Sequence, residues 1–164
     1  MASLRDVSDI KFSPDLSKAL IVGSREKEIY CCDIASGTLC EISACTGEPV
    51  QAAWFLDDET VFCYGENAEG HVTGWKLRPF TDQSSLLFSG LPLYSRTSGI
   101  GLILSETGYG LYLDANQTAQ VFDLRNGTRA IVEGLTCSGE DTFVSANAKG
   151  TKMLVSQFDP SAAG

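Results

Sequence analysis

Residues 5–45 alternate short apolar segments with turn residues. The segment Val7–Phe12 alternates apolar and polar side chains, which predicts a strand with one face toward a core. The next turn contains Pro14, which lacks a ladder donor, and Asp15, which can bond to nearby backbone. A compact antiparallel meander of four strands is therefore predicted. Its strands are Val7–Phe12 and residues 19–22, 29–34 and 39–42.

The same order of strands and turns recurs along the chain. The sequence Asp33-Ile-Ala-Ser-Gly-Thr38 returns as Asp123-Leu-Arg-Asn-Gly-Thr128, two periods of about 45 residues later. A first-strand ending also recurs, because Phe12-Ser-Pro-Asp15 is echoed by Phe55-Leu-Asp-Asp58. We therefore predict an all-β chain of four-stranded antiparallel units, the last one lacking its third and fourth strands. The predicted units are residues 5–45, 46–90, 91–134 and 135–159.

This repeat resembles that of the WD40 family, in which about 40–45 residues supply the four strands of one β-propeller blade. In that family the third strand ends in Trp-Asp, with an apolar position three residues before the tryptophan and a turn aspartate six residues before it. Each copy here keeps part of that pattern. The dipeptide positions hold Cys32-Asp33, Trp75-Lys76 and Phe122-Asp123, the apolar positions Ile29, Val72 and Ala119, and the turn positions Glu26, Glu69 and Asn116.

The resemblance implies a partial β-propeller of about three and a half blades that acts as a non-catalytic scaffold for other proteins. We expect the chain to be a portion of a larger propeller, since closure normally shelters the edges of the sheets. Two alternatives stay open. One is a propeller enzyme with a carboxylate- or metal-lined channel, and the other is a partial propeller that self-associates through its open blade edges.

The charge of the chain limits its partners. It has 12 basic and 21 acidic residues, a formal net charge of −9 at pH 7. Such a chain repels nucleic acid, so a charged partner is expected to be basic. No apolar run approaches the roughly 18 residues that span a bilayer, and the N-terminus lacks the apolar region of a signal peptide. We therefore expect an intracellular protein, cytoplasmic or nuclear, that does not bind a membrane.

The sequence offers little catalytic chemistry. Its only histidine, His71, follows Gly70 in a predicted turn, and adjacent acids such as Glu140-Asp141 are expected to face solvent. No phosphate-binding glycine motif or C-x-x-C pair occurs, so we expect no cofactor and no metal. The cysteines are expected to be reduced thiols in the core, and the two tryptophans to be packing residues. These residues are Cys31, Cys32, Cys40, Cys45, Cys63, Cys137, Trp54 and Trp75.

Overall fold

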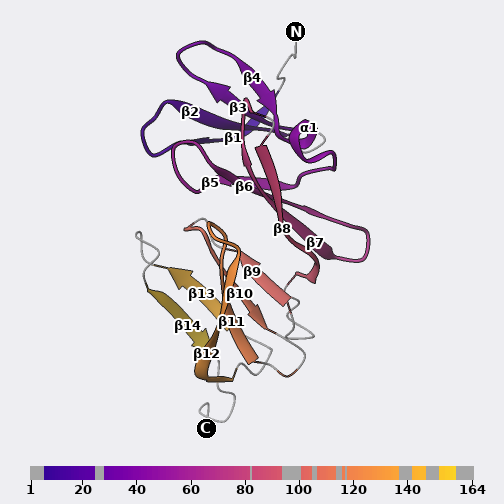
Figure 1. Cartoon of the computed structure of the whole chain (residues 1–164), viewed down its shortest axis with the longest axis vertical. Coiled ribbons are helices and arrows are strands. Elements are labelled where there is room, and N and C mark those ends of the chain that lie inside the picture. Colours follow the sequence, from indigo (N-terminus) through magenta and orange to yellow (C-terminus); the bar gives the residue numbers. More distant parts are fainter. Residues whose placement is uncertain are drawn as a thin grey trace. The chain divides into compact units, whose positions relative to one another are not determined.

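The computed structural model divides into two compact units, residues 1–90 and 91–164, each of which is built from antiparallel strands (Figure 1). No helix among the described residues is long and apolar enough to cross a membrane. The described residues are 6–24, 28–81, 83–93, 101–104, 107–113, 116, 118–136, 142–146 and 152–157.

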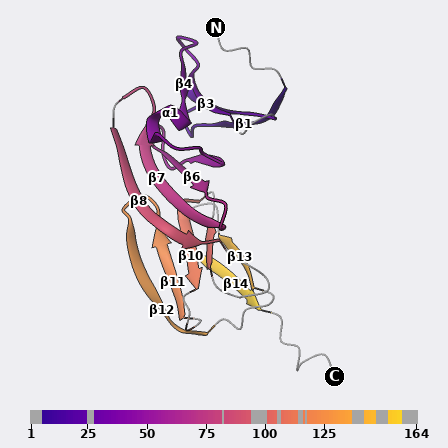
Figure 2. The same ribbon diagram turned by 90° about the vertical axis from the view of Figure 1, so that its right-hand side faces the viewer.

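The first unit begins with a four-stranded sheet, blade 1, whose strands pair in chain order. Each strand overlaps the segment that the sequence predicted. The connection to the next sheet contains a short helix, α1 (Ile42–Thr46), which packs beside the third and fourth strands (Figure 2). The strands of blade 1 are β1 (Val7–Phe12), β2 (Lys18–Gly23), β3 (Ile29–Asp33) and β4 (Leu39–Glu41).

The helix α1 corrects the predicted end of the fourth strand. Ile42 was expected to end that strand, but it opens α1 and is fully buried. The turn ends at Gly47, whose φ of 71° is left-handed and whose N–H donates to the Ser43 carbonyl over 3.0 Å. The buried isoleucine and the glycine cap together fix this turn between the two sheets.

A second four-stranded sheet, blade 2, completes the first unit, again in chain order. Its third and fourth strands are long, and Phe88 of the fourth lies over Gly74 of the third. The strands of blade 2 are β5 (Ala52–Phe55), β6 (Val61–Glu66), β7 (His71–Arg78) and β8 (Gln83–Pro92).

Apolar side chains from both sheets form one core in the first unit. Leu20, Ile29 and Cys31 of blade 1 are buried in the same cluster as residues of β6 and β7. Each such aliphatic side chain contributes about 1.5–3 kcal/mol on burial, so this cluster is the main term that holds the two blades together. The other buried members are Ile42, Val50, Ala53, Val61, Cys63, Trp75 and Leu77.

Polar contacts join the same two blades at the turn after β1. Lys18 is only 8% exposed, and its Nζ donates to the Glu59 carboxylate over 2.8 Å and to the Asp58 carbonyl over 3.2 Å. The Asp15 N–H donates to Asp58 Oδ1 over 2.8 Å. The hydrogen bond with Glu59 raises the pKa of Lys18 despite the opposing effect of burial. These contacts orient the blades, while the apolar cluster supplies most of the stability.

The face of β1 differs from the prediction. Its apolar side chains were expected to face a core, yet Ile10 is 49% and Phe12 56% exposed. The charged residue between them, Lys11, faces blade 2 instead, with its Nζ 5.2 Å from the centre of the Trp54 ring. Because side chains alternate along a strand, Ile10 and Phe12 point to the opposite side of blade 1.

The second unit contains a four-stranded sheet, blade 3, and a separate two-stranded hairpin. Buried Leu111, Leu113 and Ala119 form the core of blade 3. The hairpin matches the predicted incomplete fourth blade, whereas Cys137 and Glu140-Asp141 lie outside the described residues. The strands are β9 (Gly101–Leu104), β10 (Tyr109–Leu113), β11 (Thr118–Asp123) and β12 (Thr128–Thr136), and the hairpin is β13 (Thr142–Ala146) and β14 (Met153–Gln157).

The absence of a side chain at Gly74 is required by the packing of blade 2. A Cβ there would overlap the Phe88 ring. We predict that Gly74→Ala lowers the free energy of unfolding by about 1–3 kcal/mol, as overpacking does elsewhere. In a Phe88→Leu background the same change should cost less, because the ring edge is gone. Urea unfolding of the two single variants and the double variant measures this coupling, and strictly additive losses would contradict the packing.

The Asp15 carboxylate predicts a dependence of stability on acid. The Ser17 N–H and the Ser13 and Ser17 hydroxyls donate to it and lower its pKa to about 2 from 3.8. A lowered pKa stabilises the fold above the unfolded value, and that contribution is lost as the pH falls from about 4 to 2. Asp15→Asn should therefore flatten the fall of melting temperature across this range. An unchanged acid slope in the variant would show that the carboxylate contributes nothing.

Candidate functional site

The positions that correspond to the WD40 pattern build the blades. Ile29, Val72 and Ala119 lie on β3, β7 and β11, the third strands of their sheets, and all three are buried. At the tryptophan position, Trp75 and Phe122 are buried and Cys32 is half-buried. Glu69 and Asn116 are exposed, Lys76 is half-buried on β7, and Glu26 lies outside the described residues.

The two aspartates of the pattern close matching turns after the third strand. Asp33 Oδ1 accepts hydrogen bonds from the N–H and the hydroxyl of Ser36, both over 2.8 Å. Asp123 accepts from the Arg125 N–H and the Asn126 side chain, also over 2.8 Å. The hydrogen bonds from Ser36 lower the pKa of Asp33. These carboxylates serve as turn acceptors in two blades of the repeat.

The same two turns share a glycine four residues after the aspartate. Gly37 and Gly127 both have a φ of 69°, and each N–H donates over 2.8 Å to the carbonyl of the aspartate that opens its turn. Only glycine adopts this left-handed conformation without strain. The repeated Asp and Gly of the sequence therefore encode one hairpin geometry in blades 1 and 3.

An acidic pocket of about 640 Å³ lies beside α1 in the first unit. Four glutamates from both blades line it, and its described lining contains no basic side chain. All four are exposed, so their carboxylates keep contact with water. We call this hollow the acidic pocket, and its lining residues are Glu28, Glu41, Ser43, Ala44, Gly47, Glu48, Pro49, Val50, Gln51 and Glu66.

The loop that forms one wall of the acidic pocket is held by its own hydrogen bonds. The Thr46 hydroxyl donates to the Glu48 carbonyl over 2.8 Å, and the Ser43 carbonyl, 3.1 Å away, is a second acceptor within its reach. The Gln51 N–H donates to the Tyr64 carbonyl over 2.8 Å, which ties the loop to β6. Glu48 therefore projects from a backbone that hydrogen bonds hold in place.

The glutamates of the acidic pocket affect the pKa values of two nearby tyrosines. Burial raises the pKa of Tyr30, and the nearby Glu28 and Glu41 carboxylates raise it further. Burial likewise raises the pKa of Tyr64, with an added contribution from Glu66. The smaller contribution of the glutamates to both shifts has the sign of a negative potential, which attracts a cation.

A second hollow in the first unit has the opposite character. It measures about 350 Å³, and its lining includes Lys76 and Arg78 together with serine, threonine and glutamine side chains. Among the described pattern residues, Lys76 alone lines one of the two hollows. The acidic pocket is larger and carries more charge, so it is the stronger candidate for binding.

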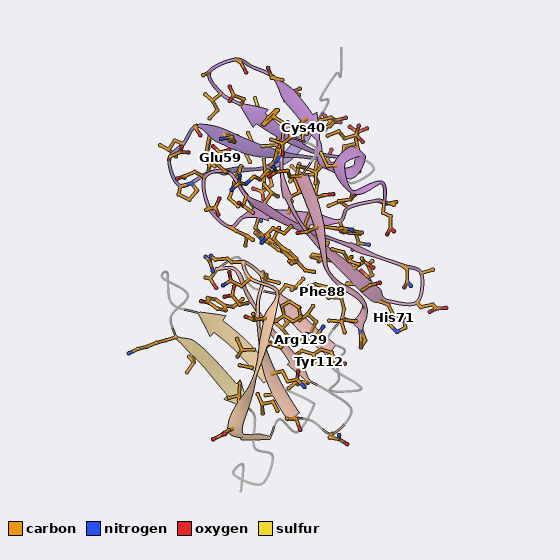
Figure 3. The ribbon with its side chains drawn as sticks, viewed as in Figure 1. Cys40, Glu59, His71, Phe88, Tyr112 and Arg129 are labelled. Atoms are coloured by element: carbon orange, nitrogen blue, oxygen red, sulfur yellow. The ribbon has the colours of Figure 1, made fainter. Side chains whose placement is uncertain are left out.

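The described residues offer no arrangement of three or more His, Cys, Asp or Glu side chains that could hold a metal ion. His71 lies at the start of β7 with a side chain that is 42% exposed, and its Nδ1 is 3.5 Å from Glu69 Oε2 (Figure 3). Neither residue lines the acidic pocket. The tryptophans pack as expected, Trp75 in the core and Trp54 stacked on Phe62 with ring centres 5.6 Å apart.

The glutamates of the acidic pocket were not singled out from the sequence. They are widely spaced along the chain, and they converge only because α1 and the loop after it fold back between the blades. The available signal was the acidic net charge combined with a connection between blades that carries Glu41 and Glu48. That signal favours a basic partner without locating its site.

No protein-family model matches the chain, and no curated protein matches its sequence. Among solved structures, TolB from Acinetobacter baumannii is similar over 94% of this chain and 41% of its own, with 17% identity and a TM-score of 0.49. The C-terminal WD40 domain of Sif2 is similar over 91% of this chain and 52% of its own, with 12% identity and a TM-score of 0.38. The chain thus spans about half the length of these matches or less.

The predicted fold class is confirmed by the strand pairing. Three four-stranded antiparallel sheets and one two-stranded hairpin follow each other along the chain, as expected for three and a half blades of a WD40-like partial propeller.

Proposed function

We propose that this chain is a non-catalytic scaffold that binds another protein, and that the acidic pocket receives a basic segment of that partner. The observation that carries the proposal is the set of four glutamates around one hollow with no basic side chain in its described lining. The proposal agrees with the net charge of −9.

The lining of the acidic pocket suits a lysine or arginine side chain. The exposed Pro49 can contact the aliphatic stem, while the glutamates around it can accept hydrogen bonds from the charged end. Because the carboxylates are exposed, each ion pair should contribute about 0.2–1 kcal/mol. The acidic pocket would therefore confer preference and rapid association more than high affinity.

The enzyme alternative receives less support from the geometry. A hydrolytic or metal-assisted mechanism needs a base or ligand set that converges on one cleft. The sole histidine lies with an exposed glutamate at a hairpin of blade 2, and neither residue lines either of the two charged hollows. Scaffolding requires only the fixed surface that the blades provide.

Binding of a basic peptide tests the proposal. We predict that an eight-residue peptide of alternating lysine and alanine binds the chain, and that Glu48→Gln combined with Glu66→Gln weakens binding by about 2- to 30-fold. Fluorescence anisotropy at low salt measures the dissociation constants, which should rise with ionic strength.

Two controls make this measurement specific. Glu69→Gln removes an equally exposed carboxylate that does not line the acidic pocket, so its affinity should match the parent chain. A peptide with glutamate in place of lysine should not bind. Equal affinity of the double variant and the parent chain would overturn the proposed site.

A second candidate function, self-association, is favoured by the exposed face of blade 1. Ile10 and Phe12 lie on β1, which is an edge strand of its sheet. The free edge of a strand can pair with a second copy of itself around a two-fold axis, and this pairing would place the two apolar rows side by side on one face of the joined sheet. The occupant that we propose for this face is thus a second copy of the chain.

Light scattering as a function of salt tests self-association. The chain should form a dimer that strengthens as salt screens the repulsion between two acidic copies. Ile10→Asp should return it to a monomer, whereas Leu86→Asp, at a similarly exposed position on β8, should leave the dimer intact. A parent chain that stays monomeric at high salt and high concentration would contradict this candidate.

A further inference from the structure

Two cysteine side chains approach each other beside α1. Cys40 lies on β4 and Cys45 in α1, and their sulfur atoms are 3.4 Å apart. Both pack against the buried apolar cluster that blades 1 and 2 share, which we call the inter-blade core or cluster, and both remain partly exposed. Figure 3 labels Cys40 in blade 1. In the structure both are thiols and no disulfide joins them.

The Cys40 and Cys45 thiols are accessible from solvent. They line a hollow of about 290 Å³ together with Thr81, Gln83 and Ser84 of blade 2. Partial exposure allows a small reagent to approach the sulfur atoms from this side. Proximity and access are two of the conditions that a redox-active cysteine pair must meet, and formation of a thiolate is the third.

The neighbouring core cysteines do not meet both conditions. Cys31 and Cys63 are fully buried in the inter-blade cluster, and burial raises the pKa of each to about 12. Cys31 stands directly opposite Cys40 across β3 and β4, so it is the main competitor for pairing. Its burial disfavours the thiolate that the exchange reaction needs.

We propose that Cys40 and Cys45 are a modification site, a dithiol that reacts reversibly with a low-molecular-weight disulfide such as oxidised glutathione to form an intramolecular disulfide. The two sulfur atoms must move from 3.4 Å to the bonding distance of about 2.05 Å, which rotation of the two partly exposed side chains can supply. This inference does not depend on the proposed binding function.

The reaction proceeds by two exchange steps. One cysteine thiolate attacks a sulfur of oxidised glutathione, forming a mixed disulfide and releasing one glutathione thiolate. The second cysteine thiolate attacks the protein sulfur of the mixed disulfide and releases the other glutathione. The two protons lost by the cysteines are taken up by the two glutathione thiolates. Two protein thiols are thus oxidised while one glutathione disulfide is reduced.

The new bond would close a short ring around the start of α1. That ring contains Ile42, whose side chain is fully buried in the inter-blade core, and Glu41 of the acidic pocket. A crosslink restricts the unfolded chain in this segment, so oxidation should stabilise the first unit. Reduction by excess thiol would reverse the effect.

Mass mapping of the full chain tests the proposal. After equilibration with reduced and oxidised glutathione, remaining thiols are alkylated and the chain is digested. We expect a peptide that contains Cys40 and Cys45, lighter by two hydrogen atoms and unalkylated at both positions. Cys40→Ser and Cys45→Ser should each abolish that species and leave a glutathione adduct on the remaining cysteine. Cys32→Ser, on the opposite face of β3, should not affect it.

Thermal unfolding supplies an independent readout. Oxidation should raise the melting temperature of the parent chain and of Cys32→Ser by roughly 5 °C, and should not raise that of Cys40→Ser. A Cys31–Cys40 crosslink, a persistent mixed disulfide on the parent chain or full alkylation of both cysteines in oxidised glutathione would overturn the proposal. An oxidised pair without a rise in melting temperature would contradict the restraint of α1.

Discussion

The first unit depends on the packing of one sheet face against another. Leu20 and Ile29 of blade 1 share a buried cluster with Val61 and Leu77 of blade 2. This contact holds the strands that carry these side chains against each other. Removing any one of these side chains to alanine would cost about 2–5 kcal/mol, a large part of the stability of a small domain. The ion pair of the buried Lys18 with Glu59, whose carboxylate is exposed, contributes less, so its role is to set the register between the blades.

The position of the acidic pocket follows from that packing. Ile42 belongs to the inter-blade cluster, and it draws the connection between the blades inward as one turn of helix. The same turn carries Glu41 on its entering side and leads through Gly47 to Glu48, so the carboxylates gather where the blades meet. The burial of Ile42 thus determines where the glutamates of the acidic pocket lie.

The sequence predicted the strands well because their signals are local. Pro14 and Asp15 mark the first turn, and the Asp and Gly of residues 33–37 and 123–127 encode the same hairpin, with hydrogen bonds that the structure shows. The face of β1 was predicted wrongly, because alternation marks the apolar row as the covered one, whereas Ile10 and Phe12 are exposed. Lys11 rather than Phe12 faces blade 2, where an aromatic ring receives its ammonium group.

The candidate site was less predictable than the fold, since its residues come from separate turns. Glu28 and Glu66 belong to different blades and share no motif. The pairing of Cys40 with Cys45 likewise depends on α1, which the sequence pattern assigned in part to a strand. Features that arise from a connection between blades depend on tertiary packing, which a pattern of strands and turns does not specify.

Native-state hydrogen exchange tests most directly whether the two blades share one core. If they do, the slowest amides of β2 and β3 will exchange with the same opening free energy as those of β6 and β7, because the strands open together. A Leu20→Ala substitution will then lower protection in both blades by the same amount. Protection lost from blade 1 alone, with β6 and β7 unchanged, would contradict a shared core.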